Sequence, residues 1–315
     1  MTTTANPNPY RYLGNEVTGE TDLDAILASG GAEFNVTMTP VQVDTPIGTV
    51  VCDTHRAVVR DDTSEILAVH TKGYTPIQYR EVTEMALEAV GLRPNDAALK
   101  YLGTINDGKQ FYATIDLGSL VLDPSGIADK ISKYLVAFAS HDGTLPVMFA
   151  ESNLRVLCSN QAPAIRAQGK AGAANFRVKH TKNMRERLAI AREALGIADA
   201  AAAAFLDTAE KMLSIKCSKS DVLRIAEQMW PLKGDSDRAK TVHTRRLATI
   251  ESLWGNSTNS GAVGDNGWAA FNTFTEFLDH GRGTNADKRA IGTVVPGSWV
   301  EASKTEAAGR VLALA

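Results

Sequence analysis

The sequence has few cysteines and no long apolar run. Its 315 residues include Cys52, Cys158 and Cys217, which lie far apart and form neither a CxxC pair nor a Cys/His zinc spacing. We therefore expect three buried free thiols in a reducing compartment. No stretch of about 18 apolar residues is present, so no membrane span is expected. The start MTTTANPNPY lacks the regions of a secretory signal, which favours a cytoplasmic protein.

The motifs of common nucleotide-dependent enzymes are also missing. The sequence contains no GxxxxGK[ST] phosphate loop, no GxGxxG after a strand, no GxSxG elbow and no HExxH helix. A motor driven by ATP is therefore disfavoured. The sequence predicts no catalytic residues, no cofactor and no bound metal.

Charge is unevenly distributed along an otherwise ordinary globular composition. Residues 1–165 carry 11 Lys and Arg against 20 Asp and Glu, whereas residues 166–315 carry 22 against 16. A polyanion would therefore contact the second half of the chain. The alternative is that the two halves of one fold attract each other.

The first half is rich in strand patterns. Spaced apolar residues predict an antiparallel meander over 36–71, followed by a helix over 80–90. Two hairpins come next, with turns at Asn106-Asp107-Gly108 and at Asp142-Gly143. Residues 153–159 fit either a strand or the start of a buried helix.

Helical patterns dominate the second half. A Gly-rich loop at 168–174 and a short strand precede a long helix that begins at Thr181, and Ser218 or Ser220 can cap the next helix. Further helices are expected over 239–254, over 268–280 and after Ser303. We predict an α+β fold, with antiparallel β-hairpins and a meander, a packed helix, and a mostly helical C-terminal part. The predicted division is 1–30 as an N-terminal tail and helix, 31–217 as the α+β core domain, and 218–315 as a helical C-terminal domain.

A basic cluster follows the midpoint of the chain. Only Glu186 opposes its positive charges, and Lys and Arg bind phosphate backbones by neutralising them. The cluster therefore predicts a nucleic-acid contact, although a solvated helix face that balances the acidic first half is the alternative. The overall pI of about 6.1 is low for a dedicated nucleic-acid-binding protein. Its members are Arg166, Lys170, Arg177, Lys179, Lys182, Arg185, Arg187 and Arg192, with His180 as a further donor.

Two other groups have competing interpretations. Aromatic residues at a spacing of three could stack on bases, but such a stripe is typical of a helix packed into the core. Two His/Asp pairs have metal-compatible side chains, but Asp142 precedes Gly143 in a hairpin turn and His280 suits a helix end. We favour the core and the turn. The residues are Trp268, Phe271, Phe274 and Phe277 in the stripe, and His141, Asp142, Asp279 and His280 in the pairs.

Several segments together resemble a known family: Tyr12-Leu13-Gly14, GYTPIQ at 73–78, SHDGT at 140–144, LRVLCSN at 154–160, RVKHTKN at 177–183, and NGWAAFNTFTEFLDH at 266–280. In this order and spacing, the chain is similar to phage- and plasmid-like proteins grouped as a domain of unknown function, DUF932. The resemblance implies a bacteriophage or other mobile-element origin and a place in the host bacterial cytoplasm, but no chemistry. Asn160-Gln161 departs from the Asn-Thr that is frequent in the family.

A more distant resemblance concerns the order of elements. A helix, antiparallel hairpins and a basic segment that leads into a long helix are similar to the core of the single-strand annealing recombinases. Those proteins need no ATP and hold one DNA strand in a positive groove as homo-oligomers. The resemblance implies binding and annealing of single-stranded DNA, with Arg155 and Asn160 lining the same groove as the basic cluster.

Two other functions stay open. The acidic first half could bind a host factor, as an anti-defence or replication-modulating protein would. A metal-dependent nuclease would have to use the two His/Asp pairs.

Overall fold

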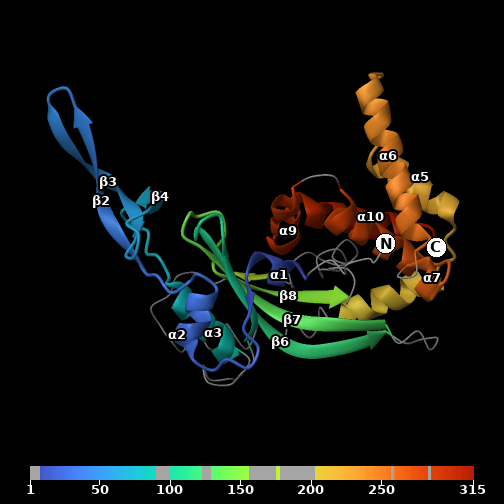
Figure 1. The fold of residues 1–315 in the computed structure, drawn as a ribbon, viewed down its shortest axis with the longest axis horizontal. Coiled ribbons are helices and arrows are strands. Elements are labelled where there is room, and N and C mark those ends of the chain that lie inside the picture. The colour runs from blue at the N-terminus through green and yellow to red at the C-terminus, as the bar shows by residue number, and fades with distance from the viewer. Residues whose placement is uncertain are drawn as a thin grey trace.

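A six-stranded antiparallel sheet lies at the centre of an elongated molecule, with a β-hairpin arm at one end and a group of helices at the other (Figure 1). The computed structural model describes residues 8–89, 99–122, 129–155, 175–177, 203–256, 259–282 and 285–315. The predicted α+β class, with strands first and helices mostly later, is confirmed.

The central sheet has the strand order β1-β5-β6-β7-β8-β9. In the predicted first hairpin turn, Asn106, Asp107 and Gly108 all have positive φ, the left-handed conformation that these residue types tolerate. Residues 153–155 continue a strand, which decides the strand-or-helix alternative for that part of the chain. The strands are β1 (Asn15–Glu16), β5 (Leu99–Ile105), β6 (Gln110–Leu122), β7 (Asp129–Ser140), β8 (Met148–Arg155) and β9 (Asn175–Arg177).

Alternate side chains fill the two faces of this sheet. Phe111 and Leu135 pack with helices α2 (Leu23–Ser29) and α3 (Tyr79–Ala89), close to the predicted helix over 80–90. On the opposite face, Tyr112 and Tyr134 pack with α1 (Pro9–Leu13) and α9 (Ala286–Val294). Residues from both ends of the chain therefore cover one face of the sheet.

The arm is the outer part of a three-stranded sheet of β2 (Val36–Thr45), β3 (Gly48–Arg60) and β4 (Ile66–Thr71). Because β4 pairs with β3 only between His55 and Val59, residues 41–53 form a two-stranded ribbon that projects from the molecule (Figure 1). Ile47 at its turn is 96% exposed. Cys52 lies in this ribbon and is half-exposed, so the expectation that it is buried was wrong. Cys217 is buried as expected, and Cys158 lies outside the described residues.

Helices form the other end of the molecule, and the cap predicted at Ser218 is present. Residues 203–214 are helical, and Ser218 makes a capping box with Asp221 at the start of α5. None of the described helices has both the length and the apolar character needed to cross a bilayer. The elements are α5 (Lys219–Met229), α6 (Asp237–Trp254), α7 (Ser260–Val263), α8 (Gly267–Glu276), the π-helical turn η2 (Phe277–Gly281) and α10 (Trp299–Leu312).

The aromatic stripe forms the centre of this helical core. Trp268, Phe271, Phe274 and Phe277 are all buried, which confirms the core interpretation and leaves no ring of the stripe free to stack on bases. The Trp268 indole Nε1 donates to the Asp129 carboxylate at 3.1 Å, so the stripe is bonded to the start of β7.

Two helices differ from the expectation. α10 begins at Trp299, before Ser303, because Ser298 caps it by accepting from the Glu301 N–H. α9 was not predicted; of its residues, only Gly292, Thr293 and Val294 are buried.

Candidate functional site

Most of the predicted nucleic-acid-binding residues lie outside the part of the chain that the structure describes, so their role stays a prediction. The same holds for the 168–174 loop and for the start of the long helix at Thr181. The residues concerned are Asn160, Arg166, Lys170, Lys179, His180, Lys182, Arg185, Arg187 and Arg192.

The backbone positions of Arg155 and Arg177 are described. Arg177 pairs with Met148 at the start of β8, whereas Arg155 ends that strand opposite Ile131. At ~3.3 Å per residue, the two positions lie roughly 23 Å apart along the sheet. They therefore do not share one phosphate, and a single groove through both would have to follow β8.

Side chains of the two His/Asp pairs already contact other residues of the fold. The buried His141 ring stacks 4.2 Å from the Tyr79 ring, and burial lowers the pKa of His141 to about 4. Asp142 accepts hydrogen bonds from Thr144 in the turn, as the turn interpretation expects. Asp279 pairs with Lys304 at 2.7 Å. Among the described residues, no group of three or more His, Cys, Asp or Glu side chains could hold a metal ion.

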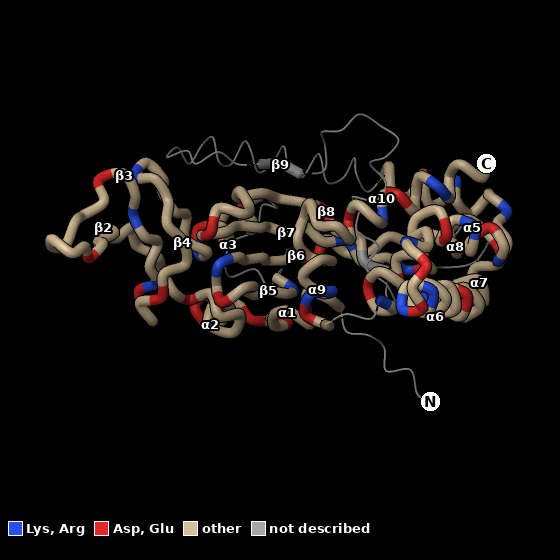
Figure 2. The backbone as a smooth tube through the Cα atoms, turned by 90° about the horizontal axis from the view of Figure 1, so that it is seen from above, with Lys and Arg blue, Asp and Glu red and all other residues tan. Residues whose placement is uncertain are grey.

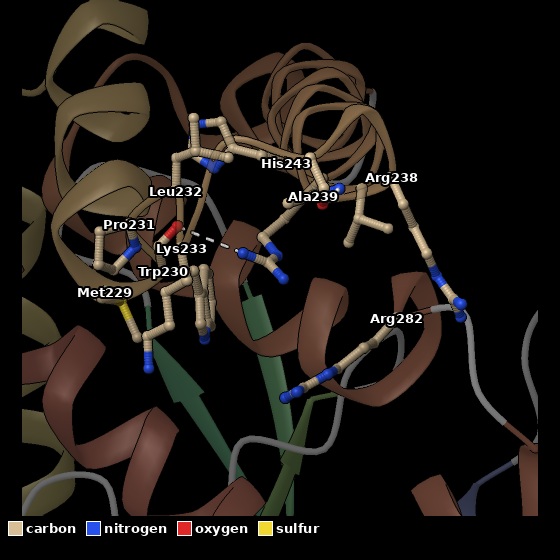
Figure 3. A pocket seen from close by; sticks show the side chains of 12 residues that line it. Met229, Trp230, Pro231, Leu232, Lys233, Arg238, Ala239, His243 and Arg282 are labelled. Carbon is tan, nitrogen blue, oxygen red and sulfur yellow. Dashed lines mark hydrogen bonds between the residues drawn. The ribbon is translucent and has the colours of Figure 1, made fainter.

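A cationic pocket of about 570 Å³ lies where α5 ends and α6 begins, and sequence reasoning missed it (Figure 3). Pro231 has no N–H to continue helix α5, so the chain turns away after Trp230. Ser236 then caps α6 by accepting from the Ala239 N–H. The pocket is formed by Met229 at the end of α5, the 230–236 loop, residues 238–246 of α6, and Arg282, which follows η2.

None of the described lining residues is acidic, and four of them are cations: Lys233, Arg238, Arg246 and Arg282. None of them forms an ion pair with a described carboxylate, whereas neighbouring helices show the usual pairing. Lys219 lies 2.8 Å from Glu251, Arg224 lies 2.7 Å from Asp221, and Arg310 lies 2.8 Å from Glu306. The pocket therefore concentrates positive charge that the described part of the protein does not neutralise.

Aromatic rings hold two of the arginines in place. The Arg246 guanidinium lies 5.8 Å from the centroid of the Trp230 ring and donates to the Trp230 carbonyl oxygen at 3.3 Å. The Arg282 guanidinium lies 4.2 Å from the centroid of Trp299. Trp230 itself packs 5.2 Å from Phe277 of the helical core. Both arginines are thus ordered before any ligand binds.

Burial makes this positive charge costly. Partial burial lowers the pKa of Arg246, and the nearby charge of Arg282 lowers it further. Burial also lowers the pKa of Arg282. The Nδ1 atom of His243 is buried and has no hydrogen-bond partner among the described residues. An anion in the pocket would relieve the repulsion and accept hydrogen bonds.

The sequence indicates part of the pocket, namely the residues that α6 contributes. Arg238, Val242 and Arg246 are spaced four residues apart, which places them on one face of a helix. Nothing in the sequence indicates that Arg282 comes to the same place.

The family described as Domain of unknown function (DUF932) matches residues 66–294, a range that contains the whole described pocket and strands β5 to β9. No curated protein matches the chain, and no solved structure matches it.

Proposed function

Since the chain belongs to the DUF932 family, a domain of unknown function, we propose a function from its pocket: the protein binds single-stranded DNA and acts in recombination or replication without ATP. The observation that carries the proposal is the group of four cations around the pocket, none of which pairs with a carboxylate in the described part of the chain. Lys and Arg that lack internal partners are free to neutralise phosphates.

The remainder of the lining favours a single strand over a duplex. Met229, Trp230, Leu232 and Val242 form an apolar wall beside the cations. Unpaired bases expose apolar faces that such walls contact, whereas a duplex keeps its bases stacked inside. The predicted basic cluster after residue 166 would extend the contact, and the resemblance to annealing recombinases, which need no ATP, agrees with this reading.

Replacing Lys233 and Arg238 with alanine is expected to weaken binding to oligothymidylate and to flatten its salt dependence. For single strands, each lost phosphate contact lowers the slope of log K against log salt by about 0.7. Fluorescence anisotropy titrations at several salt concentrations measure both quantities. Lys179→Ala with Lys182→Ala tests the predicted basic cluster in the same way.

The control removes the same charge elsewhere. Lys211→Ala with Arg310→Ala removes two cations that already pair with carboxylates, so the slope should stay at the wild-type value. Wild-type protein that binds no oligonucleotide at low salt would contradict the proposed function.

The arm supports a second candidate function, binding of a protein partner. Val43, Ile47 and Val50 are each more than half exposed on it, and the ribbon has no covering layer in the described structure. Residues 41–53 contain Asp44 and Asp53 but no Lys or Arg, and Figure 2 shows no basic position in the outer part of the arm. An apolar, acidic surface repels nucleic acid and suits a protein, such as a host factor.

Ile47→Asp is expected to abolish retention of such a partner while leaving the melting temperature unchanged, because Ile47 has almost no native contacts to lose. The measurement compares proteins retained from nuclease-treated host lysate. Ile66→Asp is the matched control, since Ile66 is 59% exposed but lies on β4, outside the arm. Equal recovery by wild type and Ile47→Asp would argue against the arm as the binding surface.

A further inference from the structure

We propose that the pocket between α5 and α6 takes a phosphomonoester at the end of a DNA strand, so that the protein prefers phosphorylated strand ends to strand interiors. This inference rests on the proposed function and specifies the ligand of the same site.

The size of the pocket indicates an end. Its volume of about 570 Å³ falls within the roughly 300–1,000 Å³ of pockets that hold one small molecule. That space suits a single nucleotide. Single-strand tracks are grooves that follow several nucleotides along the backbone.

The charge of the pocket indicates a phosphomonoester. An internal phosphodiester carries one negative charge, whereas a phosphomonoester carries about −1.5 to −2 at pH 7. The described lining offers four cations without a carboxylate, and Arg246 and Arg282 are close enough to repel each other. A doubly charged group offsets more of that repulsion than a singly charged group.

The hydrogen-bond donors agree with this choice. A guanidinium has five N–H donors, and the hydrogen bond from Arg246 to the Trp230 carbonyl oxygen uses only Nη1. Figure 3 shows Arg282 extending toward Trp230 from the opposite side of the pocket. A phosphomonoester has three terminal oxygens to receive such donors from several directions, whereas a phosphodiester has two.

The apolar wall completes the site. Met229, Trp230 and Leu232 lie on the side of the pocket at which helix α5 ends. The base attached to a bound terminal phosphate can contact this wall. Such contacts are tolerant of sequence because every base has an apolar face.

Binding of labelled oligothymidylates that differ only at one end tests the inference. Four ligands are compared by anisotropy: a strand with a 5′ phosphate, one with a 3′ phosphate, one with hydroxyls at both ends, and the hydroxyl strand lengthened by one nucleotide. The lengthened strand adds a phosphate charge inside the strand. Free thymidine monophosphate, added as a competitor, reports whether the terminal nucleotide alone fills the pocket.

Wild-type protein is expected to bind one of the end-phosphorylated strands about tenfold more tightly than the lengthened strand, which is the effect of one additional charge-assisted hydrogen bond. Arg238→Ala with Arg282→Ala should reduce that preference to about twofold or less, because the terminal charge then interacts only with distant, screened cations. Arg245→Ala is the matched control: it removes an exposed cation from the same helix that does not line the pocket, and the preference should persist.

Two results overturn the inference. Equal affinity for all four strands would leave binding to single-stranded DNA intact and remove the preference for ends. A preference that survives in the Arg238→Ala, Arg282→Ala variant would place the terminal phosphate elsewhere. Binding to none of the strands at low salt would instead remove the proposed function itself.

Discussion

Replacing Lys304 with methionine is expected to lower the free energy of unfolding by about 3–5 kcal/mol, the usual effect of leaving one partner of a buried ion pair alone. The Lys304 and Asp279 side chains are only 1% and 2% exposed, and their charged atoms lie 2.7 Å apart. Methionine fills similar space but carries no charge, so the Asp279 carboxylate would lose the cation beside it while the Thr293 hydroxyl, 2.9 Å away, would still donate to it. Chemical denaturation followed by circular dichroism measures the change.

An exposed pair on the same helix provides the control. Arg310 and Glu306 also belong to α10, but solvent reaches both, so Arg310→Ala should change stability by less than about 1 kcal/mol. The double variant Asp279→Leu, Lys304→Met should lose less stability than Lys304→Met alone, because it removes both charges of the pair and leaves neither partner alone. A loss for Lys304→Met as small as that for Arg310→Ala would show that the pair contributes nothing special.

Trp268→Ala is expected to lower the free energy of unfolding by a similar amount, about 3–5 kcal/mol, because it creates a large cavity in the helical core. The Trp268 ring is fully buried, and Phe205 meets it edge-on with ring centroids 5.9 Å apart. The substitution also removes the indole donor of Asp129 at the start of β7. We therefore expect the helical end and the sheet to be destabilised together. Thermal denaturation followed at two wavelengths measures this.

The matched substitution is Trp299→Ala. Trp299 is 44% exposed, and beyond its contact with Arg282 little would be lost, so the effect on stability should stay below about 1 kcal/mol. If Trp268→Ala is as mild as Trp299→Ala, then the stripe on α8 is not the centre of the helical core.

The features that could be predicted from the sequence are those that nearby residues decide. The turn at Asn106-Asp107-Gly108 needs left-handed backbone angles, and these residue types adopt them readily. Ser218 and Asp221 satisfy the free N–H groups at the start of α5 within one turn. The stripe from Trp268 to Phe277 could be assigned to the core because its spacing matches one helix face.

The features that could not be predicted depend on distant parts of the chain. Strand alternation is the same whether a hairpin packs against a layer or projects from the molecule. The sequence pattern therefore does not indicate the exposure of Ile47 and Cys52. The pocket joins Arg246 and Arg282, which are separated in sequence by α7, α8 and η2. Their convergence follows from the packing of α6 on α8 and η2, which a single sequence does not reveal.

The packing of α1 on α9 has a consequence for the order of events on the ribosome. Tyr12 donates to the Asp287 carboxylate at 2.7 Å, while the carbonyl of Tyr10 accepts from the Tyr112 hydroxyl. Helix α1 thus contacts the late helix α9 on one face of the sheet. During synthesis, the sheet can form long before residues 286–294 emerge. Helix α1 must therefore wait until residues 286–294 have been synthesised before its native contacts are complete.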